Sequence, residues 1–216
     1  MKTSGIWNLE EIRIADTEEV RDELIALAFG YWDYFKNSGK FEGAEKWQID
    51  FIGFLPGKRE SRRMVGPYIM NQRDVLEGGH FDDVIAYGGW PLDDHDPRGF
   101  YHLGAPNVWG KMDKIYGIPY RVLYSSNISN LFFAGRNISM THAAMSSSRV
   151  MMTCAILGQA VGEAAAIAIE YNTTPQGVYD FYIEELQQRL MRADCFIPYL
   201  VRKPGEVTYK GKLAGC

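Results

Sequence analysis

The stretch from Asn130 to Ala166, NLFFAGRNISMTHAAMSSSRVMMTCAILGQAVGEAAA, limits the possible folds more than any other part of the chain. An apolar run of strand character ends at Gly135, a polar loop follows, and a segment rich in small residues predicts a helix from about Ser147 to Tyr171. This order of elements is typical of α/β proteins. Because a helix N-terminus carries unpaired N–H groups and about half a positive charge, the loop can present an anion-binding site. An α/β core unit without any ligand has the same order, so both interpretations stay open.

The loop from Asn137 to Arg149 is more polar than a simple connection requires. It contains eight polar side chains: Asn137, Ser139, Thr141, His142, Ser146, Ser147, Ser148 and Arg149. This polarity favours a binding function over a plain core connection.

Composition argues against several other classes of function. The chain has 216 residues, of which 46% are hydrophobic, which is enough for a buried core. A formal net charge of −4 argues against a nucleic-acid or anionic-membrane partner, since either requires a clustered basic face. Three cysteines without a CxxC pair argue against a disulfide framework or a zinc site.

No signal peptide or membrane span is expected from the sequence. The first residues lack an apolar segment, and the most apolar window, residues 150–169, is interrupted by Gln159 and Glu163. A cytoplasmic location is the default expectation, and an N-terminal signal on the parent protein is left open.

The flanking regions predict helices and short strands. Residues 15–39 predict a helix ending at Gly39, and residues 174–195 predict another with Thr174 as its cap and Pro175 in its first turn. The core face of the second helix is expected to hold Val178, Phe181, Leu186 and Leu190. QIDFIGFL and DVIAYGGW predict short strands among ordered loops, and YRVLYS with NLFFAG predicts a hairpin or a crossing between sheets.

Two charged motifs each have two interpretations. RESRRMVGPY, residues 59–68, places three arginines around Glu60, which suits either carboxylate or phosphate recognition or a solvated charge cluster. The DDHD cluster, residues 93–96, predicts an Asx-type turn before Pro97 in preference to an oxygen-rich metal site, so no metal is expected. His95 within it remains a candidate acid or base.

The chain lacks the common phosphate-binding and hydrolytic motifs. No two glycines stand at i and i+2, so there is no GxGxxG, and neither a GxSxG elbow nor an HExxH motif occurs. If this protein handles a nucleotide, its phosphate loop lies elsewhere.

Four segments, taken together and in order, point to a family. RESRRMVGPY, FDDVIAYGGWPLDDH, YGIPYRVLYSSNISNLFFAGRNISMTH and SSSRVMMTCAILGQAVGEAAA closely resemble the C-terminal half of the FAD-dependent oxidoreductase family, found widely in bacteria and related to the fumarate reductase and succinate dehydrogenase flavoproteins. The resemblance covers about residues 15–198. It implies that GxGxxG belongs to an N-terminal half, so the chain is expected to be a fragment that needs this half as its partner.

The resemblance also implies a fold and its division into domains. The fold is α/β: the C-terminal part of a Rossmann-like FAD-binding domain with an α+β substrate or cap domain. Residues 1–120 are the expected substrate or cap portion, residues 121–171 the FAD-binding portion, and residues 172–216 a C-terminal helix and tail.

The cofactor implied by the resemblance is FAD, approached by the opening stretch. Gly135 and Arg136 are expected near the ribityl and phosphate portion, and the helix from Ser148 is expected to aim its positive end at flavin N1 and the C2 carbonyl. Related flavoproteins often have Asp where Arg136 stands, which puts a carboxylate contact to the ribityl chain in doubt. The implied cofactor-binding residues are Gly135, Arg136, Asn137, Thr141, His142, Ser147, Ser148 and Arg149.

The implied chemistry is hydride transfer between a small organic substrate and flavin N5. A histidine moves a proton and an arginine holds an anionic or polar group, and the candidate catalytic residues are His95, His142, Arg63 and Arg121. The alternative is a non-catalytic α/β fragment or interaction module that does not bind flavin on its own.

Overall fold

A computed structural model describes residues 17–55, 57, 62–95, 102–105 and 107–204. The chain forms two compact units, residues 1–61 with 95–107 and residues 62–94 with 108–216. The second unit thus combines most of residues 62–120 with everything after them. The division into functional domains at residues 120 and 171 stays a prediction.

The first unit is built on the helix α1 (Thr17–Asn37), which confirms the helix predicted for residues 15–39. A short 3-10 helix, η2 (Ala44–Lys46), follows, and Lys36 Nζ donates hydrogen bonds to the carbonyls of Glu45 (2.9 Å) and Trp47 (2.7 Å). No strand forms in QIDFIGFL, so that prediction is wrong. Val20 is the buried residue of α1, and the rest of its apolar stripe is partly or fully exposed.

Two small sheets accompany the helices. β1 (Val84–Gly88), predicted by DVIAYGGW, pairs antiparallel with β4 (Tyr116–Pro119), and both strands are largely buried. β2 (Leu92–His95) pairs with β3 (Asn107–Gly110), and the division between the two units falls within these strands. The expected mixture of helices and strands is confirmed as an α/β arrangement with small sheets.

Short elements join the sheets to the long helices. α2 (Gln72–Glu77) begins with a capping box in which Asn71 accepts from Arg73 N and Asp74 accepts from Asn71 N, and it ends at Gly78 in the left-handed conformation. The 3-10 helix η4 (Tyr120–Val122) follows β4 directly.

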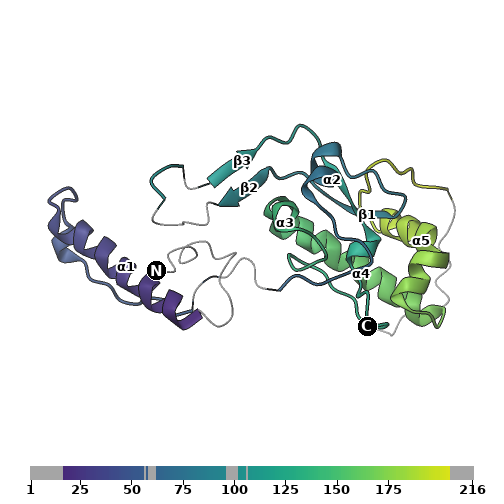
Figure 1. Ribbon diagram of the computed structural model, residues 1–216, viewed down its shortest axis with the longest axis horizontal. Coiled ribbons are helices and arrows are strands. Elements are labelled where there is room, and N and C mark those ends of the chain that lie inside the picture. Colours follow the sequence, from purple (N-terminus) through teal and green to yellow (C-terminus); the bar gives the residue numbers. More distant parts are fainter. Residues whose placement is uncertain (1–16, 56, 58–61, 96–101, 106, 205–216) are drawn as a thin grey trace. The chain divides into compact units, whose positions relative to one another are not determined.

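Three helices complete the second unit, and their boundaries correct the predicted helix over residues 147–171. α3 (His142–Ser148) ends before α4 (Met151–Glu170) begins, so the serines belong to a separate short helix. α5 (Pro175–Arg192) begins at the predicted cap, where Thr174 Oγ1 accepts from Gly177 N at 3.1 Å. α4 and α5 pack against each other and against β1 (Figure 1).

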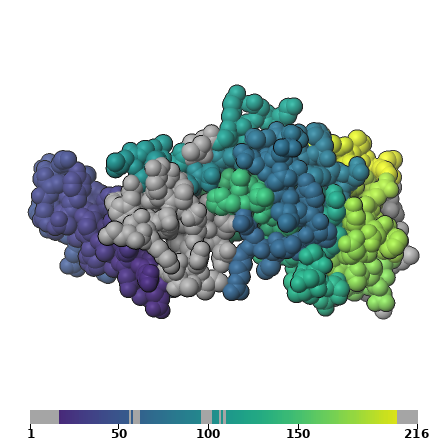
Figure 2. All heavy atoms as spheres, viewed as in Figure 1, coloured from purple at the N-terminus to yellow at the C-terminus, as the bar shows by residue number. Residues whose placement is uncertain are grey.

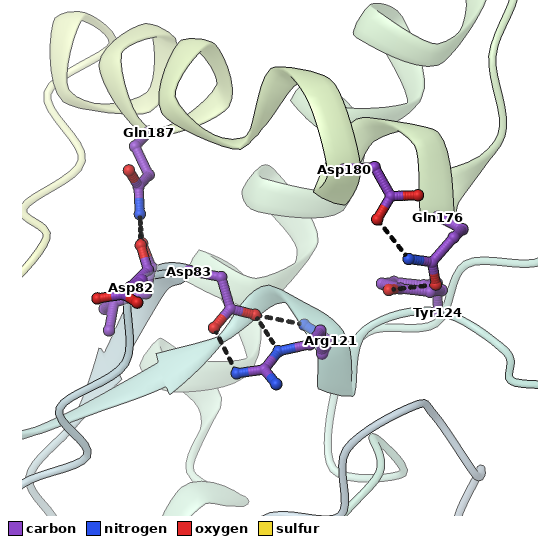
Figure 3. Close-up of polar contacts among 8 residues, drawn as sticks. Asp82, Asp83, Arg121, Tyr124, Gln176, Asp180 and Gln187 are labelled. Atoms are coloured by element: carbon purple, nitrogen blue, oxygen red, sulfur yellow. Dashed lines mark hydrogen bonds and ion pairs between the residues drawn. The ribbon is translucent and has the colours of Figure 1, made fainter.

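Polar side chains as well as apolar ones join α5 to its neighbours. Arg189 of α5 is 2% exposed and bonds three carboxylates, Glu163 and Glu170 of α4 and Glu185 of α5. Gln187 Nε2 donates to the carbonyls of Asp82 (2.7 Å) and Val84 (3.0 Å), which ties α5 to the start of β1 (Figure 3). The predicted core face of α5 is confirmed for Val178, Leu186 and Leu190, which are buried. The prediction is wrong for Phe181, which is 77% exposed.

The segment NLFFAG forms no ladder. Tyr124 and Phe132 make one antiparallel bridge, flanked by hydrogen bonds from Ser125 N to Leu131 O and from Phe133 N to Leu123 O, both 2.9 Å. Of the two predicted alternatives, the hairpin is present only as this single bridge, and the two predicted strands are wrong, since η4 occupies the residues before Leu123.

α4 has an apolar outward side. Leu157, Ala160, Ala164 and Ile167 are buried, whereas Met151, Gly158, Gly162 and Ile169 are exposed. Among the described residues, α4 is long and apolar enough to cross a membrane by length and composition. One such helix is weak evidence for a span, because core helices have the same composition, and one side of α4 packs on β1 and α5.

Candidate functional site

The polar loop of the opening stretch is held in place by an earlier part of the chain. Met64 N donates to Asn137 O (2.9 Å), Met70 N to Ser139 O (3.1 Å), and Thr141 N to Met70 O (2.8 Å). Figure 2 shows residues 62–80, in blue, beside the green surface of this loop. Arg63, a candidate catalytic residue, is exposed. It is adjacent in sequence to Met64, which hydrogen-bonds Asn137, so its backbone lies beside the loop.

The loop begins with a special backbone conformation at Gly135. Its φ of +97° lies in the left-handed region, which side chains with a Cβ disfavour, and the chain turns there before Asn137. Thr141 is the cap of α3, where its Oγ1 accepts from Ala144 N at 3.4 Å. The glycine and the cap together fix where His142 enters the helix.

Both ends of α3 contact neighbouring acids of β2. His142 Nε2 lies 2.9 Å from Asp94 Oδ1, and Arg149 Nη2 lies 3.0 Å from Asp93 Oδ2. The Arg149–Asp93 pair is largely buried, with both side chains 14% exposed, whereas His142 is 33% and Asp94 48% exposed. The inner pair therefore braces the helix, and the outer pair remains reachable from solvent.

The three serines of α3 are buried, and their hydroxyls bond inside the protein. Ser147 Oγ hydrogen-bonds the Tyr116 hydroxyl at 2.8 Å and donates to Trp90 O, while Ser148 Oγ donates to Ala144 O at 3.3 Å. Burial raises the pKa of Tyr116 to about 12, although the Ser147 hydrogen bond acts to lower it, so Tyr116 is a neutral hydroxyl at physiological pH. These contacts make Ser147 a structural link between α3, β4 and residue 90.

The positive end of the long helix lies three residues beyond Ser148, where it was expected. Ser147 and Ser148 occupy the C-terminal turn of α3, and the long helix begins at Met151 after Val150, whose apolar side chain makes no cap hydrogen bond. Met151, the first residue of α4, is 87% exposed, whereas Thr153 in the same turn is buried. The Arg136 guanidinium is close enough to lower the pKa of Cys154 in the first turn of α4, although burial, the larger effect, leaves that pKa raised.

Arg121 is committed to other contacts. Its guanidinium makes a two-pronged ion pair with Asp83 (Nε–Oδ2 2.9 Å and Nη2–Oδ1 3.0 Å), which Figure 3 shows. Its Cζ also lies 5.3 Å from the ring centroids of both Tyr68 and Tyr179. The hydrogen bonds to Asp83 raise the pKa of Arg121, although burial acts to lower it. The paired guanidinium is therefore suited to a structural role.

The DDHD cluster has a different structure from the predicted turn. Asp93, Asp94 and His95 lie in the strand β2, so the turn prediction is wrong for these residues, and Asp96 lies outside the described residues. His95 ends the strand on the side of the first unit. In the part of the chain that the structure describes, no group of three or more His, Cys, Asp and Glu side chains is arranged to hold a metal ion.

Sequence reasoning missed Asp94, Asp93 and Tyr116 as partners of the loop. The acids stood in a motif already singled out, but only the fold brings β2 alongside α3.

Beside the loop, an open cavity of about 730 Å³ lies between α2 and α3. Its lining consists of Asn71, Gln72, Arg73, Leu76, Glu77, Thr141 and Ala143.

Residues 2–190 match the family model described as FAD dependent oxidoreductase. The chain belongs to this family. Membership identifies FAD as the cofactor and a flavin-linked redox reaction as the function. No curated protein and no solved structure gives a significant match to the chain.

The chemistry of the residues around Gly135 would suit FAD. FAD carries an anionic pyrophosphate and a ring whose N1 edge becomes negative on reduction. The N-terminus of α4, where Val150 makes no side-chain cap hydrogen bond, and Arg136 would both supply positive potential, and Gly135 leaves the backbone without a side chain. Gly135, Arg136 and the first turn of α4 are therefore the groups that could hold the cofactor.

Proposed function

We propose that this chain forms one side of the FAD site of an oxidoreductase that transfers hydride between a small organic substrate and flavin N5. The proposal rests mainly on one loop, which connects a source of positive potential with a group that can transfer a proton. The loop that starts at Gly135 and Arg136, near the open end of α4, continues into His142 with its Asp94 partner. FAD supplies the two-electron acceptor, and the protein supplies positive potential and a proton-transfer group.

The roles of the other sequence-predicted residues follow from their positions. Asn137 and Thr141 shape the loop between the two features, and Arg63, exposed beside it, is proposed to hold an anionic or polar substrate group. His95 is kept as a second candidate for proton transfer. Ser147, Ser148 and Arg149 are proposed to act on the flavin by fixing α3, since their side chains bond within the unit.

We further propose that a second polypeptide segment, the expected N-terminal half, completes the site with the GxGxxG loop. The absence of glycines at i and i+2 supports this proposal, as does the exposed side of α4 at Gly158 and Gly162, where nothing lies within 4 Å of a built Cβ. A helix face of small residues suits close packing against another element. The relation to the fumarate reductase and succinate dehydrogenase flavoproteins and a bacterial origin remain predictions from motif order.

FAD titration tests the proposal. The chain alone is expected to bind FAD weakly or not at all, followed by flavin absorbance and fluorescence, and addition of a segment with the phosphate loop is expected to give stoichiometric binding. Arg136→Gln should weaken this binding about tenfold, which corresponds to about 1.4 kcal/mol. Lys203→Gln, distant in sequence and without a proposed role, is the control. Failure of FAD to bind in the presence of the second segment would favour the non-catalytic alternative.

A further inference from the structure

His142 and Asp94 form a pair that suits proton transfer. The imidazole Nε2 lies 2.9 Å from Asp94 Oδ1, and both side chains keep partial contact with solvent, at 33% and 48% exposure. The neighbours of His142 in sequence, Thr141 and Ala143, line the open cavity of about 730 Å³ beside α3. A small molecule in that cavity would lie close to this end of the helix.

We propose that Asp94 is the positioning residue for His142, which it orients and whose proton affinity it raises. The inference rests on the proposed function, because it concerns the proton-transfer group of the same reaction. A carboxylate in direct contact with an imidazole favours the protonated ring electrostatically, and the hydrogen bond restricts ring rotation. Asp94 lies in β2 and His142 lies at the start of α3, which Thr141 caps, so the contact joins two regular elements.

The proton step balances for substrates with a CH–OH or CH–NH group. The O–H or N–H bond breaks and its proton goes to the His142 imidazole, while the C–H bond breaks and its hydrogen leaves with two electrons as hydride to FAD. A C=O or C=N bond forms on the substrate. The exposed His142 then releases the proton to water.

Other charged groups also lie near α3. Asp93 pairs with Arg149 at the opposite end of the helix. From α2, which packs against α3, Arg73 and Glu77 line the cavity and carry opposite charges. Asp94 is in direct contact with His142, so its charge acts on the ring at short range.

Histidine NMR on the purified chain tests the inference without flavin. In ¹⁵N-histidine-labelled protein, the His142 signal is identified by its loss in His142→Gln. Asp94→Asn is expected to move the titration midpoint of His142 down by about one pH unit, a tenfold loss of proton affinity. Asp93→Asn, the adjacent acid with a different partner, is the matched control and should move it by less than about a third of a unit. Equal shifts in the two variants, or no shift in Asp94→Asn, would overturn the proposal.

The flavin-loaded enzyme provides the second readout. Asp94→Asn should shift the pH profile of substrate-dependent flavin reduction in the same direction as the NMR midpoint, and Asp94→Glu should restore at least part of the shift. A shifted NMR midpoint with an unchanged pH profile would refute the positioning role. Loss of flavin binding in the parent protein would instead refute the proposed function, because the NMR result does not depend on flavin.

Discussion

The exposed side of α4 at Gly158 and Gly162 is the face on which the second segment is proposed to pack, and it can be tested directly. Gly158 and Gly162 lie in the interior of a helix and are exposed, and no atom of the described residues lies within 4 Å of the position that a Cβ would take. Glycine in a helix interior is about 0.8–1.0 kcal/mol less favourable than alanine. The double variant Gly158→Ala/Gly162→Ala should therefore stabilise the isolated chain by about 1.5–2 kcal/mol, which raises Tm by about 3–8 °C for a chain of this size.

The matched control is a helical glycine in a crowded position. A Cβ on Gly177, in the first turn of α5, would lie 2.0 Å from Thr173 Oγ1, so Gly177→Ala should give no gain in stability. Urea and thermal unfolding followed by circular dichroism measure both variants. Loss of stability in the double variant would refute the conclusion that this side of α4 is uncovered in the chain alone.

The same double variant should have the opposite effect on assembly. If the second segment packs closely on this face, two added methyl groups overpack it at a cost of about 1–3 kcal/mol, or about 5- to 150-fold in affinity. Affinity is measured by calorimetry with the segment carrying the phosphate loop. Unchanged affinity together with raised stability would show that the segment binds elsewhere.

Three further predictions concern the helix pair, the flavin and the histidines. Arg189→Gln should cost about 3–5 kcal/mol of stability in urea unfolding, because it removes the buried cation that holds three partly buried carboxylates together. Arg192→Gln, which removes a buried Nε without a hydrogen-bond partner among the described residues, should cost less than about 1 kcal/mol. Met151→Glu should lower the flavin midpoint potential by about 20 mV in spectroelectrochemistry, since a carboxylate at the open end of α4 opposes the charge formed on reduction, and an unchanged or higher potential would refute the placement of flavin there. His142→Gln should slow substrate-dependent flavin reduction by about 10²- to 10⁴-fold in stopped-flow measurements with little change in FAD affinity, and His95→Gln provides the comparison; rates within about threefold of the parent for both would exclude histidine from proton transfer.

The pKa of Arg189 explains why that cluster holds its charge. Burial alone would lower the pKa, but the hydrogen bonds that Arg189 donates to Glu170 and Glu185 outweigh this effect and raise it, so the guanidinium stays charged.

Local sequence patterns were sufficient where the deciding interactions are local. Thr174 caps α5 and Pro175 fits its first turn because both act within a few residues, and the helix from Thr17 follows from its spacing of apolar residues. The β-branched and aromatic run at residues 84–88 likewise predicts β1. The order of four separated motifs identified the FAD dependent oxidoreductase family, which the match over residues 2–190 confirms.

Local patterns misplaced features that depend on contacts between distant residues. The sequence carries no break signal between Ser148 and Met151, so the positive helix end was expected at the serines. Only in the folded chain do the buried Tyr116 and the carbonyl of Trp90 bond Ser147 and leave α4 to begin separately. Phe181 has the spacing of a core residue, yet it is exposed because the neighbouring elements cover a narrower face of α5.

By itself the sequence determined the family, the cofactor, the loop that starts at Gly135 and the presence of a long helix after it. These depend on residue type and spacing along the chain. The tertiary structure decided which charged groups work together, because Asp94 and His142 are 48 residues apart and meet only when β2 lies beside α3. The tertiary structure also determines the partner of Arg121, because Asp83, 38 residues earlier, holds its guanidinium in a two-pronged ion pair. Electrostatic pairing acts over a few ångströms in space and leaves no periodic trace in the sequence, so it is the part of the site that only the fold could supply.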